Sequence, residues 1–314
     1  MTISKKNKII VVCHDAGGAE VLSAYLKANT NKYKFAAVVK GPAKNIFLKK
    51  DLERWLLDDE NPTSVISKMD KGDLLLVGTG WGSSLELEFI AEAKKYGITT
   101  AAYLDHWTNY RERFGFPREN WKKNLPDEIW VGDKYALALA TKFFKGKKMK
   151  YVPNLYFKEI KDRYKKIISK NKSRGDGVLV ISEPFSGNVN SFGDRRINSL
   201  TEFDIIENVF NFFKKHKFRK KIIFRLHPAE PREKYDFLLK RYERNLIIEK
   251  SNNSDLLVDI ASSQYVIGME SMALVIAQLC KKRVISYLPE KNKKCPLPFE
   301  NIIKIKKLSS LKLI

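Results

Sequence analysis

The sequence has little cysteine and little histidine. Its 314 residues include three cysteines, Cys13, Cys280 and Cys295, and four histidines. Three widely separated cysteines form neither a disulfide framework nor the paired spacing of a zinc site. No His-x-His pair and no Cys/His cluster occurs in the sequence. We therefore expect a reduced protein that holds no metal and needs no resident cofactor.

The sequence also lacks a long apolar run. No stretch approaches the roughly 20 residues that span a bilayer, and the apolar segment 9–13 is too short for the core of a signal peptide. The chain is 44% hydrophobic and 30% charged, which is typical of globular proteins and not of disordered ones. Because a domain usually contains about 100–200 residues, we expect two domains in a cytoplasmic protein.

Acidic residues are the scarcer charged class. There are 36 Asp and Glu against 59 Lys and Arg, and the net charge is +23. An AT-rich genome would raise the lysine content without functional meaning. The alternative is an anionic partner such as nucleic acid, acidic lipid or a phosphorylated substrate. The basic clusters at 145–150 and 214–221 lack the interleaved aromatics of a single-strand binder. We expect no specific nucleic-acid partner, and we keep open a peripheral contact with the inner face of an anionic membrane.

Short apolar runs alternate with helical patterns along the chain. The strands expected in the first half are 9–13, 35–39, 73–79, 99–104, 128–131 and 150–152, with helices at 19–28, 84–96 and 134–144. Those expected in the second half are 178–181, 221–226, 246–248, 265–268, 283–288 and 301–305, with helices at 202–215, 255–262 and 271–280. Continuous apolar strands between helices are typical of buried, parallel sheets.

This pattern predicts an α/β protein made of two Rossmann-like domains with mostly parallel sheets, facing each other across a cleft. The first domain comprises residues 1–155. Residues 156–176 are polar and rich in lysine, so we interpret them as a linker. The second domain comprises residues 177–314.

The residues after each strand are candidates for the functional site, because ligands of open parallel sheets bind outside the carboxyl ends of the strands. The first expected strand is followed by His14, Asp15, Gly17, Gly18 and Glu20. Two glycines let a ligand approach the start of the next helix, where an anion is favoured. The alternative is structural: Asp15 caps the helix and His14 is a satisfied loop residue.

A second glycine-rich segment follows the strand expected at 73–79. It contains Gly78, Gly80, Trp81 and Gly82 ahead of two serines. The segment is either a nest of backbone N–H groups for an anion or a tight turn before a helix.

The most unusual segment is 105–114, after the strand expected at 99–104. It places Asp105, His106, Arg111 and Arg113 among three aromatic residues. Such a loop can stack a sugar ring or a base, bind a carboxylate or phosphate through arginine, and supply an acid or a base. The alternative is a packing loop.

In the second half, Arg225 and His227-Pro228 follow the strand at 221–226. The proline restricts His227 to an extended backbone, and a histidine near an arginine suits a phosphate clamp better than a metal site. Gly268, Glu270 and Ser271 lie between a strand and a helix, where backbone N–H groups and a hydroxyl can hold phosphate. The alternatives are a loop histidine satisfied by backbone, a serine helix cap and a solvated Glu270.

These motifs resemble those of GT-B glycosyltransferases and, more distantly, of the non-hydrolysing nucleotide-sugar epimerases. Arg225-Leu226-His227-Pro228 resembles the His-Pro motif of bacterial sialyl-, polysialyl- and capsule transferases. This resemblance implies that His227 meets the donor phosphate. Gly268-Met269-Glu270-Ser271 looks like the donor-binding turn, which would give Glu270 the ribose.

Two other family motifs are matched less fully. Ser262-Ser263 is similar to the serine motif of those families but precedes its strand, so Ser271 is a rival for Ser263. The acidic motif of the sialyltransferases, two acids followed by glycine, is not matched, since Asp15-Ala16-Gly17 keeps one acid and the glycine.

The resemblance implies a metal-independent glycosyltransferase. It would move a sugar, with a nonulosonic or sialic-type sugar as one candidate, from a nucleotide-activated donor to a bacterial surface glycan or glycolipid. The donor would bind the second half, and Asp15 would be the general base, with His14 and Asp105 as rivals. The residues expected on the acceptor side are Gly17, Gly18, Glu20, Trp81, His106, Arg111 and Arg113. The alternatives are a nucleotide-sugar epimerase or hydrolase, and a non-enzymatic protein that binds polyanions.

Overall fold

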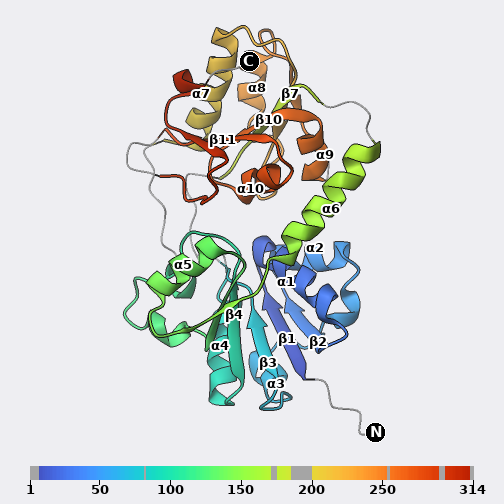
Figure 1. Ribbon diagram of the computed structural model, residues 1–314, viewed down its shortest axis with the longest axis vertical. Coiled ribbons are helices and arrows are strands. Elements are labelled where there is room, and N and C mark those ends of the chain that lie inside the picture. Colours follow the sequence, from blue (N-terminus) through green and yellow to red (C-terminus); the bar gives the residue numbers. More distant parts are fainter. Residues whose placement is uncertain are drawn as a thin grey trace. The chain divides into compact units, whose positions relative to one another are not determined.

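The computed structural model describes residues 7–80, 83–170, 175–184, 200–252, 255–289 and 294–311. The contacts among these residues separate an N-terminal unit, which ends at Tyr156, from a C-terminal unit, which begins at Phe157. Each unit contains a six-stranded parallel sheet flanked by helices (Figure 1). The predicted α/β class with two Rossmann-like halves is therefore confirmed.

The N-terminal unit has the strand order β2-β1-β3-β4-β5-β6. Its strands are β1 (Lys8–Cys13), β2 (Lys34–Val39), β3 (Leu74–Val77), β4 (Thr99–Leu104), β5 (Glu128–Val131) and β6 (Lys148–Tyr151). Its helices are α1 (Ala16–Asn29), α2 (Gly41–Lys49), α3 (Pro62–Ile66), α4 (Leu85–Lys95) and α5 (Lys134–Phe143). The register places Val12 beside Val38 on one side and Val77 on the other.

Strand β1 is buried on both faces, which explains its unbroken apolar sequence. After β2 the chain returns to the other side of β1 and forms β3, so the order of the sheet switches between β1 and β3. The turns after these two strands touch at glycines. A Cβ atom on Gly18 would lie 3.3 Å from the Cα of Gly78, and one on Gly78 would lie 2.7 Å from the Sγ of Cys13. Such a switch point is where open α/β sheets bind ligands.

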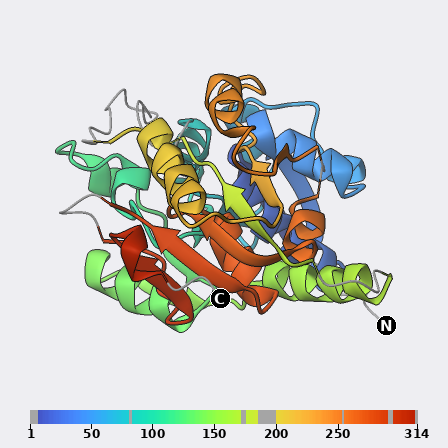
Figure 2. The same ribbon diagram turned by 90° about the horizontal axis from the view of Figure 1, so that it is seen from above.

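The C-terminal unit has the strand order β12-β11-β10-β7-β8-β9. Figure 1 labels three of its strands, β7, β10 and β11, and Figure 2 gives a second view of the chain. Its strands are β7 (Gly177–Ile181), β8 (Ile222–Arg225), β9 (Ile248–Lys250), β10 (Ser263–Gly268), β11 (Arg283–Tyr287) and β12 (Ile302–Ile305). Its helices are α7 (Glu202–Lys215), α8 (Asp236–Tyr242), α9 (Leu256–Ala261) and α10 (Met272–Leu279). The strand order switches between β7 and β10, so the turns after these two strands are again neighbours.

Helix α7 shows how the sequence builds this unit. A capping box at its start joins Thr201 and Asp204, each side chain accepting from the other's backbone N–H. The helix then packs Phe210 and Phe213 into the core beside Phe224 of β8. These large apolar side chains anchor the helix against the sheet that carries the His227 turn.

Residues 156–176, interpreted from the sequence as a linker, contain most of helix α6 (Leu155–Lys170). Its apolar residues do recur at helical spacing, but only Tyr156 and Ile160 are buried and lysines are so frequent that the composition is typical of a polar linker. Helix α2 begins directly after β2, and Pro42 occupies its first turn. Among the described helices, none has both the length and the apolar character needed to cross a membrane.

Candidate functional site

His14 and Asp15 lie directly after β1, at the switch point of the N-terminal sheet. The Nδ1 atom of His14 is 2.8 Å from Oδ1 of Asp15, and the two side chains are 24% and 30% exposed. Asp15 occupies the N-cap position of α1, but its side chain makes no capping hydrogen bond. The structural alternative, a capping Asp15, is therefore not what the structure shows. The carboxylate instead pairs with the imidazole.

Glycines hold the His14 ring and the start of α1 in close contact with their neighbours. Gly41 has a left-handed backbone (φ +51°), and a Cβ atom there would collide with the His14 ring. A Cβ atom on Gly17 would collide with the carboxylate of Asp105. The loops after β1, β2 and β4 meet around His14, Asp15 and Asp105. They approach so closely that Gly17 and Gly41 leave no room for a Cβ atom.

Glu86, in the first turn of α4, is a site residue that was not predicted from the sequence. Its Oε1 atom accepts a hydrogen bond from the backbone N–H of His14 at 2.8 Å. The residue is only 3% exposed, and its Oε2 atom has no hydrogen-bond partner among the described residues. Burial raises the pKa of Glu86 to about 7, although the His14 N–H opposes this shift, and the charge of Asp15 adds to it.

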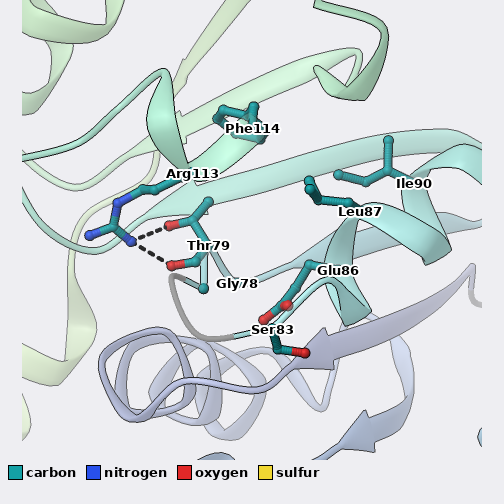
Figure 3. A pocket seen from close by; sticks show the side chains of 9 residues that line it. Gly78, Thr79, Ser83, Glu86, Leu87, Ile90, Arg113 and Phe114 are labelled. Carbon is teal, nitrogen blue, oxygen red and sulfur yellow. Dashed lines mark hydrogen bonds between the residues drawn. The ribbon is translucent and has the colours of Figure 1, made fainter. Parts of the chain in front are cut away.

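Gly80 separates the carboxyl groups of Glu86 and Asp15. A Cβ atom at this position would lie 3.3 Å from both Glu86 oxygens and 3.4 Å from Cγ of Asp15. Glu86 also lines a small pocket with Thr79, Ser83 and Arg113; Figure 3 shows Arg113 bound to Thr79, and Glu86 beside Ser83. Trp81, expected on the acceptor side, lies outside the described residues. Two carboxyl groups in different environments are an arrangement suited to acid–base chemistry.

Asp105 and Arg113 form a nearly buried ion pair in the same region. Arg113 donates from Nη1 to Asp105 Oδ1 at 2.8 Å and to Thr79 Oγ1 at 2.9 Å, and it also bonds to the carbonyl of Thr79. Its Nε donates to the carbonyl of Thr108 at 3.2 Å. Both charged side chains are 10% exposed. The guanidinium therefore fixes the loop after β4 against the turn after β3.

The other residues expected on the acceptor side have neighbours of their own. Glu20 pairs with Lys50. The Nδ1 atom of His106 is 3.0 Å from the hydroxyl of Thr108. The guanidinium of Arg111 lies 4.0 Å from the ring centre of Phe116 and is a cation–π partner of that ring. The structure thus brings His14, Asp15 and Asp105 together, while Glu20 and Arg111 pack elsewhere.

In the C-terminal unit, His227 lies in the turn after β8. Its backbone N–H faces Ser182 Oγ at 3.1 Å and Glu230 Oε2 at 3.0 Å. Its Nδ1 accepts from the backbone N–H of Ala229 at 3.2 Å. Burial lowers the pKa of His227 below its usual value, so the ring is neutral at pH 7. Pro228, which follows it, is exposed.

Arg225 and Ser263 are engaged within the fold. Arg225 donates from Nη1 to Oδ2 of the fully buried Asp259 at 2.6 Å. Ser263 is also fully buried, and its hydroxyl donates to the carbonyl of Asp259 at 2.8 Å. It lies at the start of β10, five residues and about 17 Å from Gly268 at the carboxyl end of the strand. The structure therefore does not bring Ser263 to the end of the sheet where Ser271 lies.

The turn from Gly268 to Ser271 joins β10 to α10. Ser271 caps the helix, its hydroxyl accepting from the N–H of Ala273 at 3.0 Å. Glu270 is buried, and its backbone N–H donates to Oε2 of Glu183 at 3.0 Å. Glu183 follows β7, so the two turns at the switch point are joined by this bond. The carboxylate of Glu183 thus accepts a hydrogen bond from the N–H of Glu270, one of the backbone N–H groups expected to hold phosphate.

Within the residues that the structure describes, no group of three or more His, Cys, Asp or Glu side chains is arranged to hold a metal ion. The polar groups at the described strand ends that a ligand could contact are imidazole, hydroxyl, carboxylate and backbone N–H groups.

No protein family model matches this sequence, and no curated protein matches it. Solved structures do match. The UDP-GlcNAc 2-epimerase of Methanocaldococcus jannaschii superposes with a TM-score of 0.63 at 14% identity, covering 95% of this chain and 88% of that one. The chain has the GT-B fold. The predicted GT-B resemblance is confirmed at the level of the fold.

Two further structures support the same GT-B fold. The UDP-GlcNAc 2-epimerase of Neisseria meningitidis, solved with UDP-GlcNAc bound, has a TM-score of 0.62 at 11% identity, covering 94% of this chain and 86% of that one. MurG of Acinetobacter baumannii has a TM-score of 0.54 at 9% identity, covering 98% and 88%. Identities this low relate the proteins by fold, and the activity must be argued from the site.

Proposed function

We propose that this chain is an enzyme that acts on a nucleotide-activated sugar, and that it transfers the sugar to an acceptor. The main support is the placement of His227, Glu270 and Ser271 at the carboxyl ends of β8 and β10 within a GT-B fold. An α/β sheet binds its ligand at this edge. The solved structures of this fold include enzymes named for UDP-sugars.

In this proposal the donor nucleotide binds the C-terminal unit. Its phosphate accepts hydrogen bonds from the imidazole of His227 and from N–H groups at the start of α10, where the helix dipole favours an anion. Glu270 accepts from the ribose hydroxyls. Charge on the leaving phosphate is stabilised by these donors without a metal.

The N-terminal unit supplies proton transfer to the acceptor. Asp15 is the proposed general base, with His14 as its hydrogen-bond partner. Asp105 is a weaker candidate because Arg113 and Thr79 already bind its carboxylate. A general base typically contributes about 10²–10⁴-fold to the rate. The acceptor is a glycan or a glycolipid, and the net charge of +23 suits an acceptor at an anionic membrane.

A second candidate function is epimerisation of the nucleotide sugar. Its support is that two solved structures of the same fold are UDP-GlcNAc 2-epimerases. An epimerase needs no acceptor and returns a nucleotide sugar, whereas a transferase releases the nucleotide. Product analysis therefore separates the two functions.

The test is turnover of a panel of UDP-, CMP-, GDP- and dTDP-sugars, with and without a glycan acceptor, and with products resolved by ³¹P and ¹H NMR. We expect one nucleotide class to be consumed, and we expect Asp15→Asn and His227→Ala each to lower the rate by at least about 10²-fold. Glu88→Gln is the matched control, since Glu88 is an exposed acid on α4. Unchanged rates in both site variants would contradict the proposed roles.

A further inference from the structure

The turn that carries His227 rests on a buried carboxylate, Glu230. One oxygen, Oε2, accepts from the backbone N–H of His227 at 3.0 Å and from the hydroxyl of Ser182. The other, Oε1, accepts from Lys234 Nζ at 2.8 Å and from the hydroxyl of Tyr235 at 2.9 Å. The side chain of Glu230 is 1% exposed, and both of its oxygens are satisfied. Such a group is a rigid anchor.

The anchor reaches three other parts of the C-terminal unit. Ser182 follows β7, and Tyr235 precedes α8. Lys234 also pairs with Glu202, the first residue of α7. The pKa of Glu230 lies below its usual value: burial alone would raise it, but the hydrogen bonds from Lys234, Ser182 and Tyr235 outweigh burial. The carboxylate is therefore charged at neutral pH.

The same turn determines which nitrogen of His227 carries the proton. The N–H of Ala229 points at Nδ1 from 3.2 Å, so Nδ1 is an acceptor. A neutral imidazole with an accepting Nδ1 carries its proton on Nε2. The neutral ring then presents a hydrogen-bond donor, which matches an oxyanion and not a cation.

We propose that Glu230 and Lys234 are positioning residues, which hold the turn so that His227 presents an Nε2–H donor to an oxyanion. The identification of this oxyanion as the phosphate of a nucleotide sugar rests on the proposed function. The positioning itself rests on the contacts around Glu230 and is independent of the ligand.

The two charges act on the ring in opposite directions. The negative charge of Glu230 raises the pKa of His227, and the positive charge of Lys234 lowers it. Replacing Glu230 by Gln should therefore lower the pKa of His227 further. Replacing Lys234 by Met should raise it. These shifts test whether the two charges face the ring, and the tautomer of His227 tests its positioning.

The experiment is ¹H–¹⁵N NMR of the histidine side chains in the full chain, with the His227 signals assigned by their loss in His227→Gln. We expect the Nε2–H tautomer in the wild type and opposite pKa shifts in Glu230→Gln and Lys234→Met. Glu233→Gln, an exposed acid in the same segment, should leave the His227 signals unchanged. If Glu230→Gln does not fold, Ser182→Ala replaces it as the test variant, because it removes one acceptor of the His227 N–H. We expect the Nδ1–H tautomer to be detected in this variant.

An Nδ1–H tautomer in the wild type would overturn the proposal, and so would a His227 titration that none of the variants alters. Affinity for the nucleotide that the wild type binds best should fall about tenfold in Glu230→Gln. Should no nucleotide bind the wild type, the proposed function fails. The NMR result still decides whether Glu230 and Lys234 position the ring.

Discussion

Glu86 should make the stability of the N-terminal unit depend on pH. Burial moves the pKa of this carboxyl from 4.5 to about 7 in the folded chain. Between these two values the folded state holds a proton that the unfolded state has released. The contribution of Glu86 to stability is therefore most favourable below about pH 4.5, falls as the pH rises through this window, and carries the full penalty above about pH 7. A difference of about 2.5 pKa units corresponds to about 3 kcal/mol.

The substitution Glu86→Gln removes this titration. The amide oxygen of Gln can still accept the His14 N–H, so the hydrogen bond at that position is retained. We expect the variant to be more stable than the wild type at pH 8 by up to about 3 kcal/mol, and to differ little from it at pH 4.5. Glu88→Gln, on the exposed side of the same helix, is the control and should leave the pH dependence unchanged.

Urea unfolding monitored by tryptophan fluorescence is the suitable assay. All five tryptophans lie before residue 156, so the signal reports on the N-terminal unit. Equal slopes of unfolding free energy against pH in the wild type and in Glu86→Gln would refute the argument that burial holds this carboxyl protonated.

Three further predictions concern the ion pair, a glycine and the nucleotide turn. Arg113→Ala should lower the unfolding free energy by about 3–5 kcal/mol, because it leaves a nearly buried carboxylate unpaired; a loss below about 1 kcal/mol in urea unfolding would argue against it. Gly41→Ala should destabilise the chain more than Gly97→Ala, since both glycines have positive φ but only Gly41 faces another side chain, the His14 ring, within 4 Å. Glu183→Gln should tighten nucleotide binding by a few-fold, about 0.3–1 kcal/mol, because it removes a negative charge beside the start of α10. Calorimetric titration would measure this, and weaker binding would show that Glu183 supports the turn instead.

The central strands of both sheets were predictable from the sequence because they are buried on both faces. The edge strands β6 and β9 are exposed or half-buried, and they are displaced by about two residues from the expected 150–152 and 246–248. The expected strands 99–104 and 128–131 and the expected helix 202–215 have the bounds that the structure shows. Each has a strong local signal, an apolar run or an amphipathic period. Helix α6 also has an amphipathic period, but its polar, lysine-rich composition led to its interpretation as a linker.

The candidate site was only partly predictable, since its contacts join distant parts of the chain. His14 and Asp15 stand out because they follow a strand. Glu86 lies 72 residues from His14, so no local pattern predicts their contact. Its helical spacing from Phe89, Ile90 and Ala93 is the one signal that places it on the buried face of α4, unlike Glu88. Glu183 reaches Glu270 over 87 residues. Rossmann topology gives the edge of the sheet where ligands bind, but the pairing of individual side chains at that edge depends on packing.

The most direct test of the central claim is calorimetric titration of the chain with CMP, CDP, UDP, GDP, ADP and dTDP, in parallel with His227→Ala. The account predicts that one nucleotide binds the wild type and that binding is lost or strongly weakened in the variant. A ligand at 100 times its dissociation constant would also stabilise the fold by about 2.7 kcal/mol, which gives an independent readout. If no nucleotide binds, while polyanions bind with a steep dependence on salt, the chain is a polyanion-binding protein and the enzymatic account is wrong.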